Sequence, residues 1–269
     1  MNIQSLKKMP QLSQIRRMEA VSFRSFPATS CVFDGTWAVR LTAGHPAKRL
    51  NSVNPLDPCD NSRLEERIHM ANQRFKSFGR SLVFRLTPLA PAGLKELLQE
   101  SGWTPFEESI VMIADISKFE LENTIDQVPL KDTGSWIDDY IKLSKYKLEV
   151  KPGLAEIIGA TEPETGLFVH SNKEGVPASV LRCVHDRDVA GVFDLVTNQD
   201  MLREGHGTRI MQTGLLWASK KGASSAWLQV KSASEPAIAL YKSMGFSELY
   251  RYTYWKPPVG DAPLNFSAA

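Results

Sequence analysis

The chain switches repeatedly between two spacings of its hydrophobic residues, and each switch marks the boundary of an element. In the first half, alternating apolar residues predict strands over Trp37–Leu41, up to Val53, over Leu82–Leu86 and over Ser109–Ala114. Helical spacing predicts helices from Ser62 to Gly79 and from Pro91 to Gln99. Residues 1–20 are polar and show neither spacing, so we expect a loose lead-in there.

The second half repeats this mixture after a polar segment, residues 117–133, which contains Pro129 and predicts a linker. Strands are expected over Leu167–His170, Ala178–Val184, Val189–Thr197, Ala226–Val230 and Phe246–Trp255. Helices are expected from Ser135 to Tyr146, from Gly207 to Lys221 and from Pro236 to Met244. Strands interleaved with helices throughout the chain indicate a mixed α/β (α+β) fold.

The two halves match each other at one fixed offset of 143 residues. Leu97–Trp103 aligns with Leu240–Phe246, and the same shift brings Phe84–Leu86 onto Trp227–Gln229 and Asn51–Val53 onto Asp194–Val196. Each match alone is weak, and coincidence is the alternative, but a single offset that satisfies three elements favours a duplicated unit. We therefore predict two units, each a mixed, mostly antiparallel sheet flanked by helices, over residues 21–116 and 134–269.

Composition and charge exclude several classes of protein. The chain has 269 residues, of which 42% are hydrophobic and 23% charged, values typical of a globular protein. The 32 basic residues nearly balance the 30 acidic ones, which argues against a dedicated nucleic-acid binder. No run of about 18 apolar residues predicts a membrane span, and the first residues lack the apolar stretch of a signal peptide. We expect a cytoplasmic protein.

Neither the cysteines nor the histidines have metal-ligand spacing. Cys31, Cys59 and Cys183 are far apart and odd in number, so we expect reduced, buried thiols rather than disulfides or a four-cysteine zinc site. The histidines outside the loop described next are scattered, so no metal is predicted.

The segment that carries chemistry is the loop between the strand ending at Thr197 and the helix after Gly207. Its sequence is Leu202-Arg203-Glu204-Gly205-His206-Gly207-Thr208. The first N–H groups of a helix have no partner inside it and its dipole favours negative charge, while glycine lets an anion approach the backbone. The loop lacks the lysine of the nucleotide P-loop and the third glycine of the dinucleotide fingerprint. An ordinary turn into a helix is the alternative interpretation.

Three segments together resemble the GNAT N-acetyltransferase superfamily. They are Gly205–Met211, Ala226–Val230 and Pro236–Phe246, which match the order R/Q-x-x-G-x-G/A and then N-x-P-A-x-x-L-Y-x-x-x-G-F. The resemblance covers about residues 135–256. The first half, with Trp37–Arg40 and Arg49–Val53, resembles the degenerate copy of a tandem, two-copy bacterial type. It has Ser62-Arg63-Leu64 where the second half has Gly205-His206-Gly207, so only the second half is expected to be active.

The resemblance implies acetyl-CoA as co-substrate and assigns the residues that bind it. The pyrophosphate is expected on the backbone N–H groups of Arg203, Glu204, Gly205, His206, Gly207 and Thr208, with His206 a spacer rather than a catalyst. The pantetheine arm is expected along Leu195, Val196 and Thr197, where the sheet splays, and near Ser234. Two positions depart from the family pattern: Leu202 replaces the usual Arg or Gln, and Ser234 replaces Asn, whose reach is longer.

The implied mechanism is direct attack of a primary amine on the thioester in a ternary complex, with an N–H near Val196 stabilising the oxyanion. Tyr241 matches the family tyrosine that protonates the departing thiolate, although it could be a packing residue. Asp194 is a candidate general base because burial would favour its neutral form, although it could be a structural carboxylate. No metal takes part.

These inferences predict an N-acetyltransferase for a small-molecule or peptide amine, present as a monomer or a homodimer, with no nucleic-acid or membrane partner. The first half is expected to support the second, with the Asn51–Asn54 region closing the acceptor pocket. The alternative is a non-catalytic acyl-CoA-binding sensor whose acceptor pocket is blocked.

Overall fold

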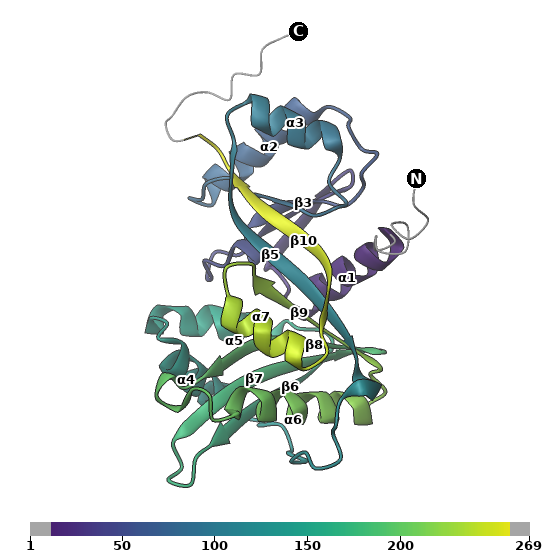
Figure 1. Cartoon of the computed structure of the whole chain (residues 1–269). Coiled ribbons are helices and arrows are strands. Elements are labelled where there is room, and N and C mark those ends of the chain that lie inside the picture. The colour runs from purple at the N-terminus through teal and green to yellow at the C-terminus, as the bar shows by residue number, and fades with distance from the viewer. Residues whose placement is uncertain (1–11, 259–269) are drawn as a thin grey trace, which may run out of the picture. The chain divides into compact units, whose positions relative to one another are not determined.

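The computed structural model describes residues 12–258 (Figure 1). Its ten strands form one mixed, mostly antiparallel sheet in the order β1-β2-β3-β4-β10-β5-β9-β8-β7-β6. We predicted a separate sheet for each half, whereas the hydrogen bonding is continuous from β1 to β6. The described chain nevertheless divides into two compact units: unit 1 is residues 12–20, 28–110 and 250–258, and unit 2 is residues 21–27 and 111–249.

Unit 1 contains most of the elements of the first half. They are α1 (Leu12–Ser25, whose last residues belong to unit 2), β1 (Ser30–Asp34), β2 (Trp37–Leu41), the 3₁₀ turn η2 (Lys48–Leu50), β3 (Ser52–Pro55), α2 (Leu64–Ser77), β4 (Phe84–Leu86), α3 (Ala92–Glu100) and the start of β5 (Thr104–Asp115). The side chains of Trp37, Phe75 and Phe84 are fully buried, and they form the centre of its core.

Helix α1 and strand β1 correct the sequence prediction. Residues 12–20 were expected to be loose, but they begin α1, because Ile15 and Met18 lie one turn apart and are 1% and 2% exposed. The rest of the expected lead-in lies outside the described residues. Strand β1 was not predicted because it is an edge strand on which Val32 and Phe33 remain exposed.

Unit 2 contains the elements that follow β5. They are η3 (Ile116–Lys118), α4 (Thr133–Ser144), η4 (Leu148–Val150), α5 (Lys151–Gly159), β6 (Glu164–Ser171), β7 (Pro177–Asp186), β8 (Val189–Thr197), η5 (Gln199–Met201), α6 (His206–Lys220), β9 (Ser225–Lys231), α7 (Glu235–Ser243) and the start of β10 (Ser247–Lys256). Helix α5 was not predicted from the sequence.

Helices α4 and α6 pack on the β6–β7–β8 part of this sheet (Figure 1). Trp136 of α4 is fully buried, donates its indole N–H to the carbonyl of Phe168, and belongs to the same core cluster as Val180. Gly214 of α6 lies instead against Leu181. Because neighbouring residues of a strand point to opposite faces, the two helices cover opposite faces of β7.

The offset of 143 residues recurs in the elements themselves. Shifted by 143, the bounds of α3 become those of α7, 235–243, and the first residue of β5 becomes that of β10, 247. The same shift places β2 within β7 and β4 within β9, superposes α2 on α6 to within one residue, and brings β3 onto the end of β8. Six consecutive elements therefore recur in the same order and at the same spacing.

Each unit takes one strand from the other half of the sequence. In unit 1, the central strand β4 pairs with the C-terminal strand β10, with Tyr254 opposite Arg85. In unit 2, β9 has β5 as its neighbour, and residues 111–115 of β5 belong to that unit. Since β5 and β10 occupy equivalent places under the 143-residue shift, the two halves exchange their last strands.

Candidate active site

The sheet of unit 2 opens at the end of β8. The parallel pairing of β8 with β9 runs only from Val189 to Val192, although both strands continue beyond that point. On the other side of β8 a bulge interrupts the pairing with β7, and Asp194 at this bulge has φ +52°. The backbone of Leu195, Val196 and Thr197 therefore has an edge toward β9 that makes no ladder hydrogen bond.

The loop before α6 presents backbone N–H groups beside this opening. Gly205 caps the helix with φ +79°, and the N–H of Arg209 donates to its carbonyl at 3.0 Å. The N–H groups of His206, Gly207 and Thr208 precede that first helical bond, so they have no acceptor inside the helix. A 15-residue helix adds its positive dipole end at the same place.

Gly207 lies in close contact with two neighbouring elements. A Cβ at this position would lie 3.2 Å from the Thr197 hydroxyl and 3.5 Å from Leu240, so the start of α6 lies against the end of β8 and against α7. The residues assigned to the pyrophosphate and those assigned to the pantetheine arm therefore meet at Gly207. No larger residue fits there without displacing its neighbours.

Charged side chains surround the loop. Arg203 is exposed and has φ +66°. Leu202, which stands where the family usually has Arg or Gln, is 49% exposed. The His206 ring lies 3.2 Å from a carboxylate oxygen of Glu204 and 3.1 Å from the Arg209 guanidinium. Both nitrogens of the His206 ring are thus engaged by neighbouring side chains, one from the loop and one from α6.

Helix α7 is attached more loosely than its counterpart in the first half. None of its residues is buried, and Tyr241 is half-buried, whereas Leu98 at the equivalent place in α3 is fully buried. Burial raises the pKa of Tyr241 to about 12, so its phenol is protonated at neutral pH. Ser234 precedes α7, and its hydroxyl makes no capping hydrogen bond to the helix.

Asp194 is held in an ion pair. Its carboxylate accepts a hydrogen bond of 2.7 Å from Nε of Arg182, a fully buried residue that also donates to the carbonyl of Ser25 at 3.0 Å. The Arg182 guanidinium lies over the rings of Phe26 and Phe193. Asp194 compensates the charge of Arg182, and removing its carboxylate would leave a buried cation unpaired and so destabilise the fold.

A hollow of about 440 Å³ adjoins Val196 on the α4 side of β8. Its lining residues are Tyr140, Leu143, Ser144, Lys145, Tyr146, Val196 and Gln199. The ring of Tyr140 stacks on Trp136 at 5.4 Å and lies 5.9 Å from that of Tyr146. The lining contains no carboxylate, so the hollow offers aromatic faces and one lysine.

The corresponding loop of unit 1 carries different side chains. Under the 143-residue shift, Asp60 occupies the place of Arg203 and Leu64 that of Gly207. Hydrogen bonds from Thr36, Ser62 and Arg67 hold the pKa of Asp60 well below its usual range, so the carboxylate is ionised and pairs with Arg67 at 2.9 Å. Leu64 also stands at the place where the loop of unit 2 has Gly207, so the two loops differ in both charge pairing and size of side chain.

Two further expectations are corrected by the structure. Asn51 and Asn54 are 6% and 1% exposed, and their side chains bond to the backbone of their own unit, so they are not available to close an acceptor pocket. Of the three free cysteines, only Cys183 is buried, and burial raises its pKa to about 12. Cys31 in β1 and Cys59 in a loop are exposed instead, because both lie at the surface of unit 1.

Residues 12–258 contain neither a cluster of metal ligands nor a helix suited to cross a membrane. That part of the chain contains no group of three or more His, Cys, Asp or Glu side chains placed to hold a metal ion. None of its helices combines the length and the apolar character that crossing a membrane requires.

Known proteins resemble this chain in sequence and in fold. The Uncharacterized N-acetyltransferase YobR of Bacillus subtilis (strain 168) is 27% identical over 255 residues, which are 90% of this chain and 98% of YobR. A GCN5-related N-acetyltransferase from Kribbella flavida has a similar fold, with a TM-score of 0.66 at 17% identity over 91% of this chain and 96% of its own. A tandem GNAT protein from the clavulanic acid biosynthesis pathway also has a similar fold. Its TM-score is 0.61 at 13% identity, and the match covers 96% of this chain and 93% of its own.

The fold, the loop and these relatives define an acyltransferase of the GNAT N-acetyltransferase superfamily. The sequence profile described as "Probable histone acetyltransferase Rv0428c C-terminal" matches residues 12–255, so the chain belongs to that family. The superfamily predicted from three short segments is thereby confirmed.

Proposed function

We propose that unit 2 transfers an acetyl group from acetyl-CoA to a primary amine, and that the first half is a degenerate copy of the second. The observation that carries this proposal is the meeting of the open edge of β8 with the free N–H groups of α6 at Gly207. The loop supplies donors for a pyrophosphate, and the strand edge supplies donors and acceptors for the amide groups of a pantetheine arm.

The reaction needs no covalent enzyme intermediate. The amine nitrogen forms a bond to the thioester carbonyl carbon, the C–S bond breaks, and the N–H near Val196 stabilises the oxyanion between these events. A proton leaves the attacking nitrogen, and the sulfur departs as a thiolate. A thiolate is a good leaving group, so the help required from an acid is modest.

Tyr241 assists the leaving thiolate chiefly as a hydrogen-bond donor. Its pKa of about 12 lies above that of an ordinary thiol, about 8.5, so full proton transfer to sulfur is unfavourable. The same shift keeps the phenol protonated and able to donate throughout the neutral range. Because no full proton transfer takes place, its contribution, about tenfold, falls below the 10²–10⁴-fold range typical of acid–base catalysis.

The geometry favours a structural role for Asp194 over the role of general base. Its carboxylate is hydrogen-bonded to a buried guanidinium, and a proton on it would weaken that pair. We therefore assign proton removal from the amine to solvent. Asp194→Asn keeps the shape of the side chain and should lower thermal stability, while the pH at which the rate is half-maximal should stay unchanged.

The hollow beside Val196 receives the acceptor. It adjoins the strand edge where the thioester is expected, and its aromatic lining without a carboxylate suits an amine with an apolar or aromatic body. The test is release of free CoA thiol with a panel of amines that compares aromatic amines with polyamines. Tyr146→Ala should raise KM for the preferred amine and leave the Kd for acetyl-CoA unchanged.

Acetyl-CoA that binds without thiol release on any amine would contradict the enzymatic proposal for this site. It would favour instead an acyl-CoA-binding sensor.

A further inference from the structure

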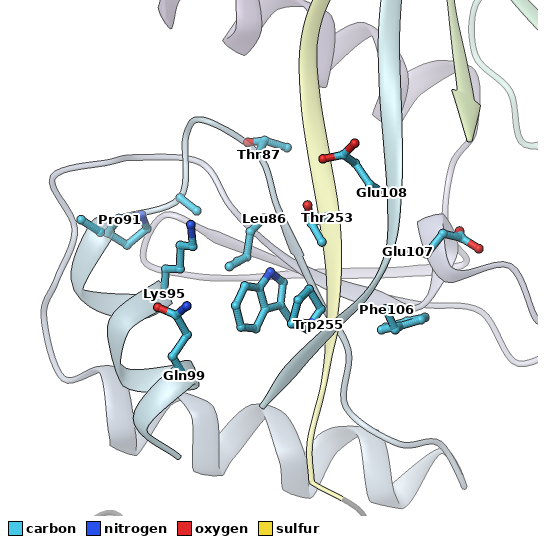
Figure 2. Close-up of a pocket in the computed structure, with 13 residues that line it drawn as sticks. Leu86, Thr87, Pro91, Lys95, Gln99, Phe106, Glu107, Glu108, Thr253 and Trp255 are labelled. Atoms are coloured by element: carbon cyan, nitrogen blue, oxygen red, sulfur yellow. The ribbon is translucent and has the colours of Figure 1, made fainter. Parts of the chain in front are cut away.

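Unit 1 contains a cavity of about 650 Å³ that the acetyl-transfer site does not use. It lies between α3, the end of β4, the start of β5 and β10, all within unit 1. Figure 2 shows Lys95 and Gln99 projecting from α3 on one side and Glu108 from β5 on the other, with Leu86, Thr253 and Trp255 between them. Its volume lies in the range of sites for small organic ligands, about 300–1,000 Å³.

The floor of this cavity is apolar and is held in place by paired strands and core packing. Leu86 and Trp255 are 8% and 5% exposed and belong to the core of unit 1, and Thr253 pairs with Leu86 across β10 and β4. Pro91 at the start of α3 adds a rigid edge. A floor made by strands and a core indole does not need to rearrange before a flat or apolar ligand packs on it.

Within the described part of the chain, the acidic side chains around the cavity are ion-paired, whereas its lysine is not. Glu107 is paired with Lys48 at 3.2 Å, and Glu108 with Arg251 at 2.6 Å, so both carboxylates are already neutralised. Among residues 12–258, nothing forms an ion pair or hydrogen bond with the side-chain amine of Lys95, the one lysine in the lining. A ligand therefore meets one uncompensated positive charge above an apolar floor.

We propose that this cavity binds a small organic acid with an apolar or aromatic body, its carboxylate on Lys95 and its body on Leu86 and Trp255. The neutral amide of Gln99, one helical turn from Lys95, provides a second donor. The site belongs to the first half alone, because the 143-residue shift places Ile238 at the position of Lys95 and so removes the cation from the equivalent helix face.

The test is calorimetric titration of the full chain with 3-phenylpropionate and with its uncharged amide, 3-phenylpropanamide. Hydrogen bonds to a charged group contribute about 1.5–3 kcal/mol, so the acid should bind at least about tenfold more tightly than the amide. Lys95→Met keeps the aliphatic part of the side chain and removes the charge. It should lower the affinity for the acid to that for the amide. Lys76→Met, at an exposed lysine of α2 outside the cavity, is the matched control and should bind the acid normally.

A second variant tests the cavity rather than the charge. Ala92→Trp introduces an indole at an exposed lining position of α3 and should abolish binding of both probes in a protein that still unfolds cooperatively. Equal affinities for acid and amide, an unchanged affinity in Lys95→Met, or no binding of the acid at millimolar concentration would each overturn the proposal. None of these measurements depends on acetyl transfer.

Discussion

Cutting the chain between its halves should leave two pieces that cannot fold apart. Glu122 and Asn123 lie in an exposed turn after β5, so a protease site inserted between them should not disturb the intact protein. After cleavage, residues 1–122 carry β5, which unit 2 requires, and residues 123–269 carry β10, which unit 1 requires. The cleaved protein should therefore remain one particle.

The size of the effect follows from the side chains that each piece would lose. In unit 2, Val111, Met112 and Ile116 are 0%, 0% and 3% exposed. Burying each contributes about 1.5–3 kcal/mol, so the loss of all three costs about 5–9 kcal/mol. This is comparable to the total stability of a domain, about 5–15 kcal/mol. The piece 123–269, like the shorter fragment 134–269, should therefore be insoluble or inactive alone.

The assay is gel filtration and acetyl-CoA titration before and after cleavage, followed by expression of each piece alone and of both together. We expect the cleaved protein to elute and bind as the intact one does, and the separately expressed pieces to be recovered only when co-expressed. If 123–269 alone is monodisperse, unfolds at the Tm of the full chain and binds acetyl-CoA, then the exchange of strands has no energetic importance and the reasoning fails.

Four other outcomes are expected. Gly207→Glu should weaken acetyl-CoA binding by a hundredfold or more, since two charges about 4 Å apart near a surface interact by about 4 kcal/mol. The control variant Gly159→Glu, at an open helix end, should bind acetyl-CoA normally. Equal affinities of the two variants in calorimetry would refute the loop assignment. Tyr241→Phe should keep the Kd for acetyl-CoA and lower kcat about tenfold, and an unchanged kcat would leave the tyrosine a packing residue. Because the pKa of this tyrosine is about 12, its ionisation should not lower the wild-type rate below about pH 10. Titration of the intact chain should give one acetyl-CoA, and a stoichiometry near two would mean that the first half is not degenerate. A thiol reagent at pH 8 should modify two cysteines in the folded protein and three after denaturation, because Cys183 is buried with a pKa of about 12; three in the folded state would contradict its burial.

Much of the fold was predictable because local signals agreed with it. The glycine after α3 and the glycine before α6 mark helix ends that propensity alone identifies, and the 143-residue offset found in three short matches extends to six elements. Strand β1 was missed because an edge strand has no buried face to impose alternation, and Val32 and Phe33 are both exposed. The exchange of β5 and β10 was also missed, because equivalent strands carry equivalent patterns and pairing is decided by tertiary contacts.

The residues proposed for the site stay a prediction, whereas the partners of its charged groups are visible only in the structure. The loop from Arg203 to Thr208 was identified by its glycines, whose spacing is visible in the sequence. The partners of Asp194 and Asp60 were not visible, since Arg182 is 12 residues from the former and Thr36 is 24 residues from the latter. These contacts are the basis on which we propose a structural role for Asp194, and they lie beyond the reach of a local sequence pattern.

The exchanged strand also constrains the order in which the protein can be completed during synthesis. Domains generally fold as units from the N-terminus while the chain is being made. Unit 1 cannot do so here, because β10, which covers the edge of β4, is translated only after the other strands of both units. Until then β4 presents unpaired backbone groups that can pair with other chains. A ribosome that stalls before β10 would thus leave the first half of the protein incomplete as well as the second.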